Sequence, residues 1–172
     1  ENIHCGFLPP AIRHICGSPP LPHPKIGNRT RLIQQLCIEY HAGQAGILWF
    51  ATEEGLNKFD GTRFITYYKE EQSSSVQSIT GNELNEVYTD PVQPVIWIAT
   101  QRAGLNAYNY ETQSFSVYQY NPEDPQSLIT NDVTHITSSV QAGKGLWVCT
   151  YYRGIEYLDI ATGKFTHYNK ST

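Results

Sequence analysis

The sequence has no methionine, and only 16% of its 172 residues are charged, against ~25% in an average soluble protein. No apolar run approaches the ~18 residues that a membrane span needs, so we expect no membrane contact by this segment. Lysine and arginine are few and scattered singly, and the formal net charge is −4. A basic stripe for a phosphate backbone is therefore absent, which argues against nucleic-acid binding.

The chain also lacks an initiating methionine and any charged start that leads into an apolar stretch and a cleavage site. We therefore interpret it as a mature or excised piece. Composition divides it near residue 45: residues 1–44 hold six of the ten prolines, three of the four cysteines and four of the six histidines. Residues 1–31 resemble nothing in the rest of the chain, and we predict that they form a poorly ordered leader.

The rest of the sequence repeats itself, with tryptophans spaced by 48 and then 50 residues. Each tryptophan is followed by a threonine and a glycine, and later by a phenylalanine that leads by three residues to a tyrosine. The repeated positions are Trp49, Trp97 and Trp147; Gly55, Gly104 and Gly154; and Phe64, Phe115 and Phe165. The linkers match as well, with Asn82 equivalent to Asn131. So many positions in register identify an internal repeat.

Each repeat holds four short strand signals separated by turn residues, which in the second repeat are 82–89, 95–100, 104–110 and 114–120. Within 95–100, alternation places Trp97 and Ala99 on one face and Ile96 and Ile98 on the other. Four antiparallel strands every 40–50 residues are typical of propeller blades. The predicted fold is all-β, a β-propeller of three four-stranded blades behind the leader, with segments 32–69, 70–120 and 121–172.

Three blades fall short of the ~4–8 of a closed propeller, so the propeller is incomplete. We interpret the repeated tryptophans as residues buried between neighbouring blades rather than as ligand-stacking rings. Such a stack leaves one apolar blade face exposed at each end, and another protein surface must cover each of them. The predicted partners are the remaining blades of the same propeller or other copies of the chain, which would make it a homo-oligomer.

The pattern LWFATEEGLNKFDG, followed by the serine and asparagine linker, resembles the two-component regulator propeller repeat over about residues 45–172. This repeat builds the periplasmic sensors of Bacteroidetes hybrid histidine kinases. The resemblance implies a periplasmic segment that senses a ligand, typically an oligosaccharide, as an N-terminal fragment of the sensor. In that family the sensor is dimeric and signals to kinase, receiver and DNA-binding regions, none of which has its motifs here. The third repeat departs from the family pattern, with Glu156 in place of asparagine.

The cysteines and histidines near the start of the chain are candidates for a metal site or for disulfides. The candidate ligands are His4, Cys5, His14, Cys16, His23, Cys37 and His41. Their spacing is irregular and lacks the paired CxxC of structural zinc sites, so we predict no metal and no cofactor. Disulfides among Cys5, Cys16 and Cys37 remain open in a periplasmic setting. Cys149 is predicted to be a small buried thiol.

Catalytic motifs are also lacking, and this segment is predicted not to be an enzyme. Glu53-Glu54 supplies carboxylates without an identifiable partner. His135 and His167 fall on predicted strands, where they are more simply surface residues than bases. Two other classes stay open: a fragment of a propeller lyase or glycosidase, and a propeller that binds proteins.

For ligand binding, the loops between the second and third strands of each blade are the candidates, because they differ while the strands around them agree. Arginine suits carboxylate or sulfate groups, and tyrosine suits stacking on sugar rings. The alternative is that they are solvated loop residues. The candidate residues are Glu53, Glu54, Arg102, Tyr151, Tyr152 and Arg153.

Overall fold

The computed structural model describes the backbone of residues 37–42 and residues 47–70, 78–141 and 143–168 in full. Within these ranges the chain forms strands and turns, and no helix there is long and apolar enough to cross a membrane. The predictions for the leader 1–31, including the metal and disulfide candidates His4, Cys5, His14, Cys16 and His23, lie outside the described residues. Of the candidates Cys37 and His41, only the backbone is described.

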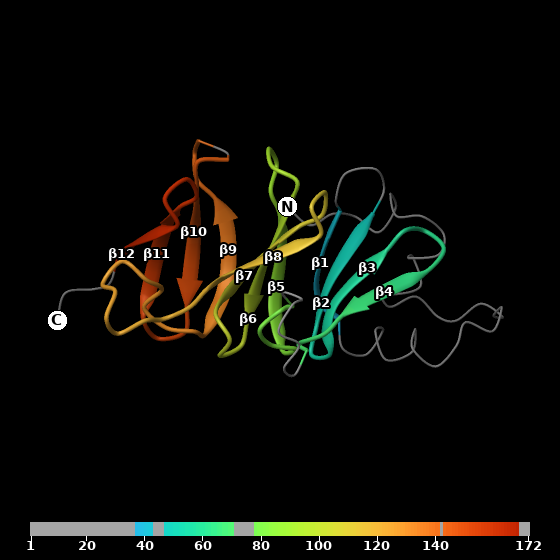
Figure 1. Cartoon of the computed structure of the whole chain (residues 1–172), viewed down its shortest axis with the longest axis horizontal. Helices are drawn as coiled ribbons and strands as arrows, with labels where there is room; N and C mark the ends of the chain where they lie inside the picture. Colours follow the sequence, from blue (N-terminus) through green and yellow to red (C-terminus); the bar gives the residue numbers. More distant parts are fainter. Residues whose placement is uncertain (1–36, 43–46, 71–77, 142, 169–172) are drawn as a thin grey trace. The chain divides into compact units, whose positions relative to one another are not determined.

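The strands form three antiparallel sheets of four strands, each in sequence order (Figure 1). Blade 1 comprises β1 (Cys37–Ala42), β2 (Leu48–Thr52), β3 (Gly55–Phe59) and β4 (Phe64–Tyr67). Blade 2 comprises β5 (Leu84–Thr89), β6 (Val95–Thr100), β7 (Leu105–Asn109) and β8 (Ser114–Tyr118). Blade 3 comprises β9 (Val133–Ser138), β10 (Gly145–Thr150), β11 (Gly154–Asp159) and β12 (Lys164–Tyr168). The all-β prediction of incomplete propeller blades is confirmed, while the segment boundaries drawn between the blades stay predictions.

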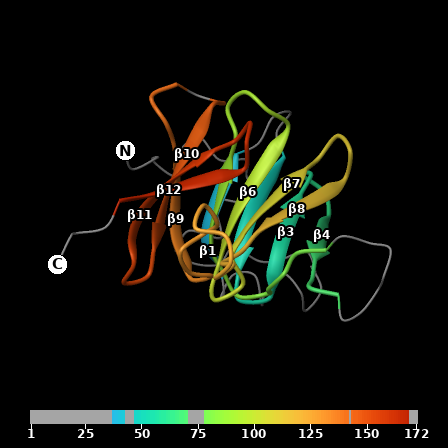
Figure 2. The ribbon, with the colours of Figure 1, turned by 60° about the vertical axis from the view of Figure 1, so that its left-hand side comes forward.

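The blades stand side by side in both views of the ribbon (Figures 1 and 2), with β5 contacting β1 and β2, and β9 contacting β5 and β6. Even their irregularities repeat. In each blade the pairing of the first and second strands shifts register at the start of the first strand, between Cys37 and Glu39 in blade 1 and between Leu84 and Glu86 in blade 2. Blade 3 has the same shift opposite Cys149 and Thr150. The sequence repeat therefore extends to the backbone.

The hydrophobic core lies between the blades. Strand β6 is buried on both faces because it has a blade on either side: Trp97 and Ala99 pack in the cluster shared with blade 3. Ile96 and Ile98 pack in the cluster shared with blade 1. The predicted alternation of this strand is confirmed.

The same aromatic positions recur at each blade junction. The rings pack in equivalent pairs: Trp49 with Tyr67 (6.0 Å between ring centroids), Tyr67 with Phe115 (6.1 Å), Trp97 with Tyr118 (6.0 Å) and Tyr118 with Phe165 (6.0 Å). Trp49 and Trp97 are each only 2% exposed, as predicted for residues between blades. Trp147 is only half-buried, against Tyr157 and Tyr168 of its own blade. It lies on the face of blade 3 that has no neighbouring blade among the described residues.

The repeated glycines have the positive φ that their turns require: 101° at Gly55, 91° at Gly104 and 102° at Gly154. A Cβ atom at Gly55 or Gly104 would also collide with the carbonyl oxygen of Tyr67 or Tyr118. The N–H groups of Gly55 and Gly104 donate hydrogen bonds to the carbonyls of Asn82 and Asn131, in the connections to the next blade.

Candidate ligand-binding pocket

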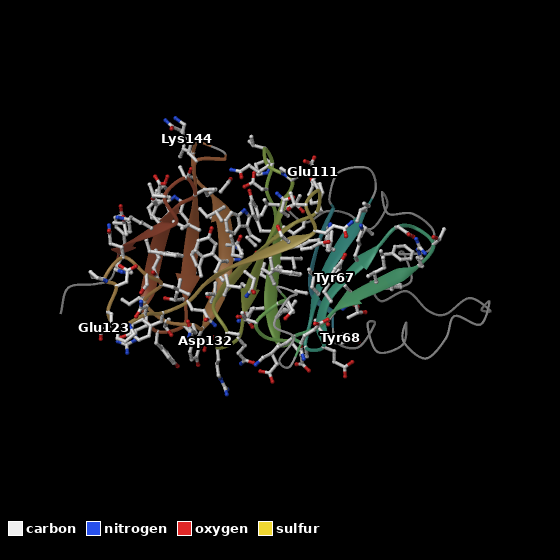
Figure 3. All side chains as sticks on the ribbon, in the orientation of Figure 1. Tyr67, Tyr68, Glu111, Glu123, Asp132 and Lys144 are labelled. Atoms are coloured by element: carbon white, nitrogen blue, oxygen red, sulfur yellow. The ribbon has the colours of Figure 1, made fainter. Side chains whose placement is uncertain are left out.

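The turns between second and third strands gather at one edge of the sheets, together with the connections between blades. Figure 3 places Asp132 and Tyr68 at this edge, whereas Lys144 and Glu111 lie at the opposite edge. The turn of blade 1 has two residues between Thr52 and Gly55, while those of blades 2 and 3 have three. The longer turns use the left-handed conformation, with φ of 63° at Arg102 and 59° at Tyr152.

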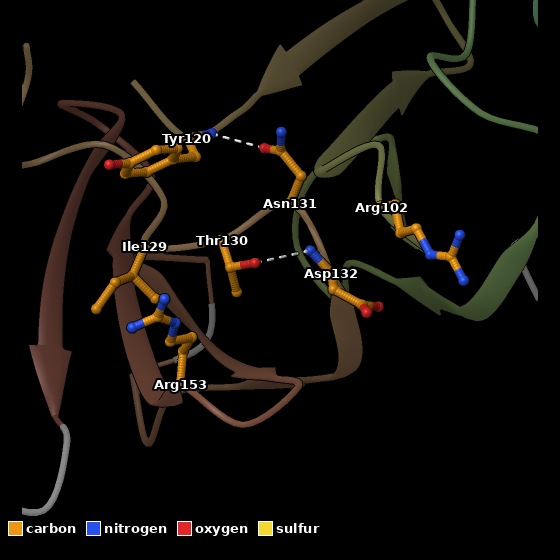
Figure 4. Close-up of a pocket in the computed structure, with 7 residues that line it drawn as sticks. All are labelled: Arg102, Tyr120, Ile129, Thr130, Asn131, Asp132 and Arg153. Carbon is orange, nitrogen blue, oxygen red and sulfur yellow. Dashed lines mark hydrogen bonds between the residues drawn. The ribbon is translucent and has the colours of Figure 1, made fainter. Parts of the chain in front are cut away.

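A pocket of about 520 Å³ opens at this edge between blades 2 and 3 (Figure 4). Arg102 comes from the β6–β7 turn and Arg153 from the β10–β11 turn, and the rest of the lining comes from the connection between β8 and β9. The lining residues are Arg102, Tyr120, Ile129, Thr130, Asn131, Asp132 and Arg153.

Asn131 fixes the blade connection that lines the pocket. Its side-chain oxygen accepts a hydrogen bond from the N–H of Tyr120 (2.7 Å), and its carbonyl accepts one from the N–H of Gly104 (2.8 Å). Next to it, the carbonyl of Asp132 accepts a hydrogen bond from the N–H of Tyr151 (3.0 Å). The connection is thereby tied to both of the turns that supply the arginines.

The two arginines are exposed and stand on opposite sides of the segment 129–132 in Figure 4. Within the described part of the chain, neither guanidinium has a carboxylate within ion-pair distance; the ion pairs there are Arg63 with Asp60, His135 with Glu86 and His167 with Glu156.

A buried carboxylate bonds to the segment that lines the pocket. Glu156, 1% exposed, accepts a hydrogen bond from the N–H of Ile129 (3.1 Å) and contacts Nδ1 of His167 at 2.9 Å. Nε2 of the same imidazole donates to the carbonyl of Pro125 (3.0 Å), since a carbonyl can only accept. The carboxyl and Nδ1 must then share a proton. Burial raises the pKa of Glu156, against the opposing effect of its hydrogen bonds and of His167.

The histidine predictions need one correction. His135 is a strand-surface residue as expected, 61% exposed and 2.8 Å from Glu86. His167, at 25%, is instead half-buried and paired with Glu156, because the third blade carries a carboxylate where the other blades have an amide. Cys149 was expected to be buried and is only half-buried, and burial raises the pKa of its thiol.

The structure brings only part of the predicted binding set together. Arg102 and Arg153 line the pocket, whereas Tyr151 and Tyr152 lie outside its lining and pack on each other, with ring centroids 4.1 Å apart. Glu53 and Glu54 are exposed on the turn of blade 1, away from the pocket. The binding roles of all six stay predictions.

Sequence reasoning missed Tyr120 and Asp132, which lie in the connection between β8 and β9. The only signal was their position, two residues after the tyrosine of one repeat and directly before the first strand of the next. Among the described residues there is also no cluster of three or more His, Cys, Asp or Glu side chains that could hold a metal.

Neither a family model nor a curated protein matches this chain. Among solved structures, it is 92% identical over 80% of its length to the extracellular domain of a hybrid two-component system of B. thetaiotaomicron, with a TM-score of 0.77. It spans only 19% of that domain. This match confirms the resemblance to the sensors of hybrid two-component systems.

Two further structures share the fold. The extracellular domain of a one-component system of B. thetaiotaomicron is 23% identical over 74% of this chain, which covers 17% of it, with a TM-score of 0.57. The tricorn protease is 16% identical over 80% of this chain, which covers 12% of it, with a TM-score of 0.56. At these identities the likeness concerns the blade architecture alone.

Proposed function

We propose that this chain, whose blades are homologous to those of the extracellular domain of a hybrid two-component system, is part of a periplasmic sensor that recognises an oligosaccharide and signals its presence. The observation that carries the proposal is the 92% identity over 80% of the chain. The matched sensors are extracellular domains, in agreement with the location predicted from the repeat.

The arrangement of the blades supports recognition rather than chemistry. Rigid strands hold turns of differing sequence at one edge, which is how scaffolds commonly present binding residues. The chain spans about a fifth of its relative, so the signalling steps that lie outside this chain are also proposals. We infer that the sensor controls a histidine kinase across the membrane, and that further blades or a second copy cover the open faces.

The direct test is binding and turnover by the intact extracellular domain that carries these blades. We expect calorimetry to detect an oligosaccharide from a panel of plant and host polysaccharide fragments, and chromatography to show that it is released unchanged. Cleavage of the bound saccharide would instead identify a lyase or glycosidase. Binding of peptides without any saccharide would identify a protein-interaction propeller, and either result overturns the proposal.

A further inference from the structure

We propose that the pocket between blades 2 and 3 recognises an acidic oligosaccharide, with Arg102 and Arg153 binding negative groups on separate sugar residues. That the ligand is a saccharide rests on the proposed sensing function. The acidic character and the spacing of the contacts come from the pocket itself.

The charge of the pocket favours an anion. Its lining holds two guanidinium groups and one carboxylate, that of Asp132. Guanidinium presents a planar set of donors that matches a carboxylate or a sulfate with two parallel hydrogen bonds. Neither arginine has such a partner within the described residues, so a ligand would provide one without breaking an existing ion pair.

The placement of the arginines sets the form of the ligand. Arg102 and Arg153 come from the turns of different blades and flank the segment 129–132 (Figure 4), which suits an extended ligand better than a single small anion. An extended chain with charges on different sugars would reach both. Tyr120, in the same lining and 51% exposed, offers a ring face on which a sugar can stack.

The backbone of the pocket is fixed before any ligand arrives. Asn131 ties the connection to Tyr120 and to the β6–β7 turn, and Glu156 ties Ile129 to blade 3. A preformed site loses less conformational entropy on binding than one that must be ordered. The exposed side chains of the two arginines are the parts that would be ordered by the ligand.

The test compares acidic and neutral tetrasaccharides on the intact extracellular domain, by calorimetry at low and high salt. The probes are tetragalacturonate for carboxylates, a chondroitin sulfate tetrasaccharide for sulfates, and cellotetraose as the neutral probe. We expect at least one acidic probe to bind, with affinity that falls at high salt, and R102Q and R153Q each to weaken it roughly 10-fold or more, as expected for loss of a charge-assisted hydrogen bond.

The matched control is R63Q, since Arg63 is also an exposed arginine, 76% exposed, on a turn outside the pocket. This variant should bind like the unmodified domain, and circular dichroism should show all three variants to be folded. Acidic binding that survives in both R102Q and R153Q overturns the inference, as does binding of cellotetraose alone, and in both cases the proposed saccharide sensing stands. If no saccharide of any kind binds, the proposed function fails together with the inference.

Discussion

The two blade junctions are built on the same frame but filled differently. At each one, an asparagine carbonyl of the following connection accepts the N–H of the preceding blade's glycine at 2.8 Å, Asn82 for Gly55 and Asn131 for Gly104. The side-chain oxygens of the two asparagines also accept equivalent N–H groups, from Lys69 at 2.6 Å and from Tyr120 at 2.7 Å.

The side chains packed between the blades differ at one central position. In the first junction, Tyr108 packs edge-on against Trp49 and its hydroxyl lies 3.2 Å from that of Tyr67. In the second junction, the equivalent residue is Leu158, buried in a cluster that also holds Trp97 and Phe165. In the second junction, the buried carboxylate of Glu86 accepts a hydrogen bond from the N–H of Ile136. The two junctions thus share the same hydrogen bonds to the backbone, whereas the side chains packed between the blades differ.

The largest effect is expected where a tryptophan is fully enclosed by a junction. W97A should lower the free energy of unfolding by about 3–5 kcal/mol, as for other buried aromatic truncations, because Trp97 is 2% exposed. W147A should cost clearly less, since Trp147 is half-buried on the uncovered face. Urea unfolding of the chain followed by circular dichroism measures both. Equal losses would show that the face of blade 3 is covered in solution, as by a second copy.

The next prediction separates two costs of replacing a glycine: the strain of a positive φ in a residue with a side chain, and the collision of its Cβ with a neighbour. G104A should destabilise the chain by more than G61A, because both glycines have φ above 90° but only Gly104 has a neighbour that a Cβ would strike. For G61A we expect about 1–2 kcal/mol, the cost of a left-handed conformation in a residue with a side chain. Thermal unfolding of the two variants gives the comparison. Similar melting temperatures would contradict the role assigned to the Tyr118 carbonyl.

The frame of these junctions could be predicted from the sequence, because a repeated residue needs a repeated environment. The spacing of the tryptophans, the alternation in 95–100 and the positive φ of the glycines all follow from the repeat. Tyr120 and Asp132 escaped prediction although the repeat aligns them with Lys69 and Glu83, because the register of a repeat does not show which positions line a pocket.

The pairing of Glu156 with His167 was within reach of the sequence but was missed. These residues face each other across β11 and β12, as Asn57 and Thr66 do in blade 1. Both therefore depart from the repeat at cross-strand positions. Two such departures together indicate one exchanged interaction, whereas each alone looks like a surface substitution.

Measuring the free energy of unfolding at several pH values tests the pairing of Glu156 with His167. Since burial raises the pKa of Glu156 above its usual value of about 4.5, the folded chain binds this proton more tightly than the unfolded chain does. The resulting stability is fully present below about pH 4.5 and is lost as the pH rises through the higher folded value. We therefore expect wild type to lose stability relative to E156Q as the pH rises above about 4.5, in urea unfolding at several pH values. The control E111Q, at an exposed position, should show no such trend, and a trend of opposite sign for E156Q would show that the pair with His167 outweighs burial.

The smallest effect concerns the tyrosine hydroxyls, and it compares the side-chain packing of the two junctions directly. Tyr67 and Tyr118 occupy the same position in successive blades, but only Tyr67 has a tyrosine hydroxyl opposite, because Leu158 replaces Tyr108 at the second junction. Burial and the contact with Tyr108 raise the pKa of Tyr67, which fits a hydroxyl that stays protonated and hydrogen-bonded. Y67F should therefore cost about 1 kcal/mol, the usual net value of one hydrogen bond. Y118F should change the free energy of unfolding by less, since no tyrosine hydroxyl lies opposite that of Tyr118 among the described residues. If the two substitutions cost the same in urea unfolding, the hydroxyl pair contributes nothing to the first junction, and ring packing alone distinguishes it from the second.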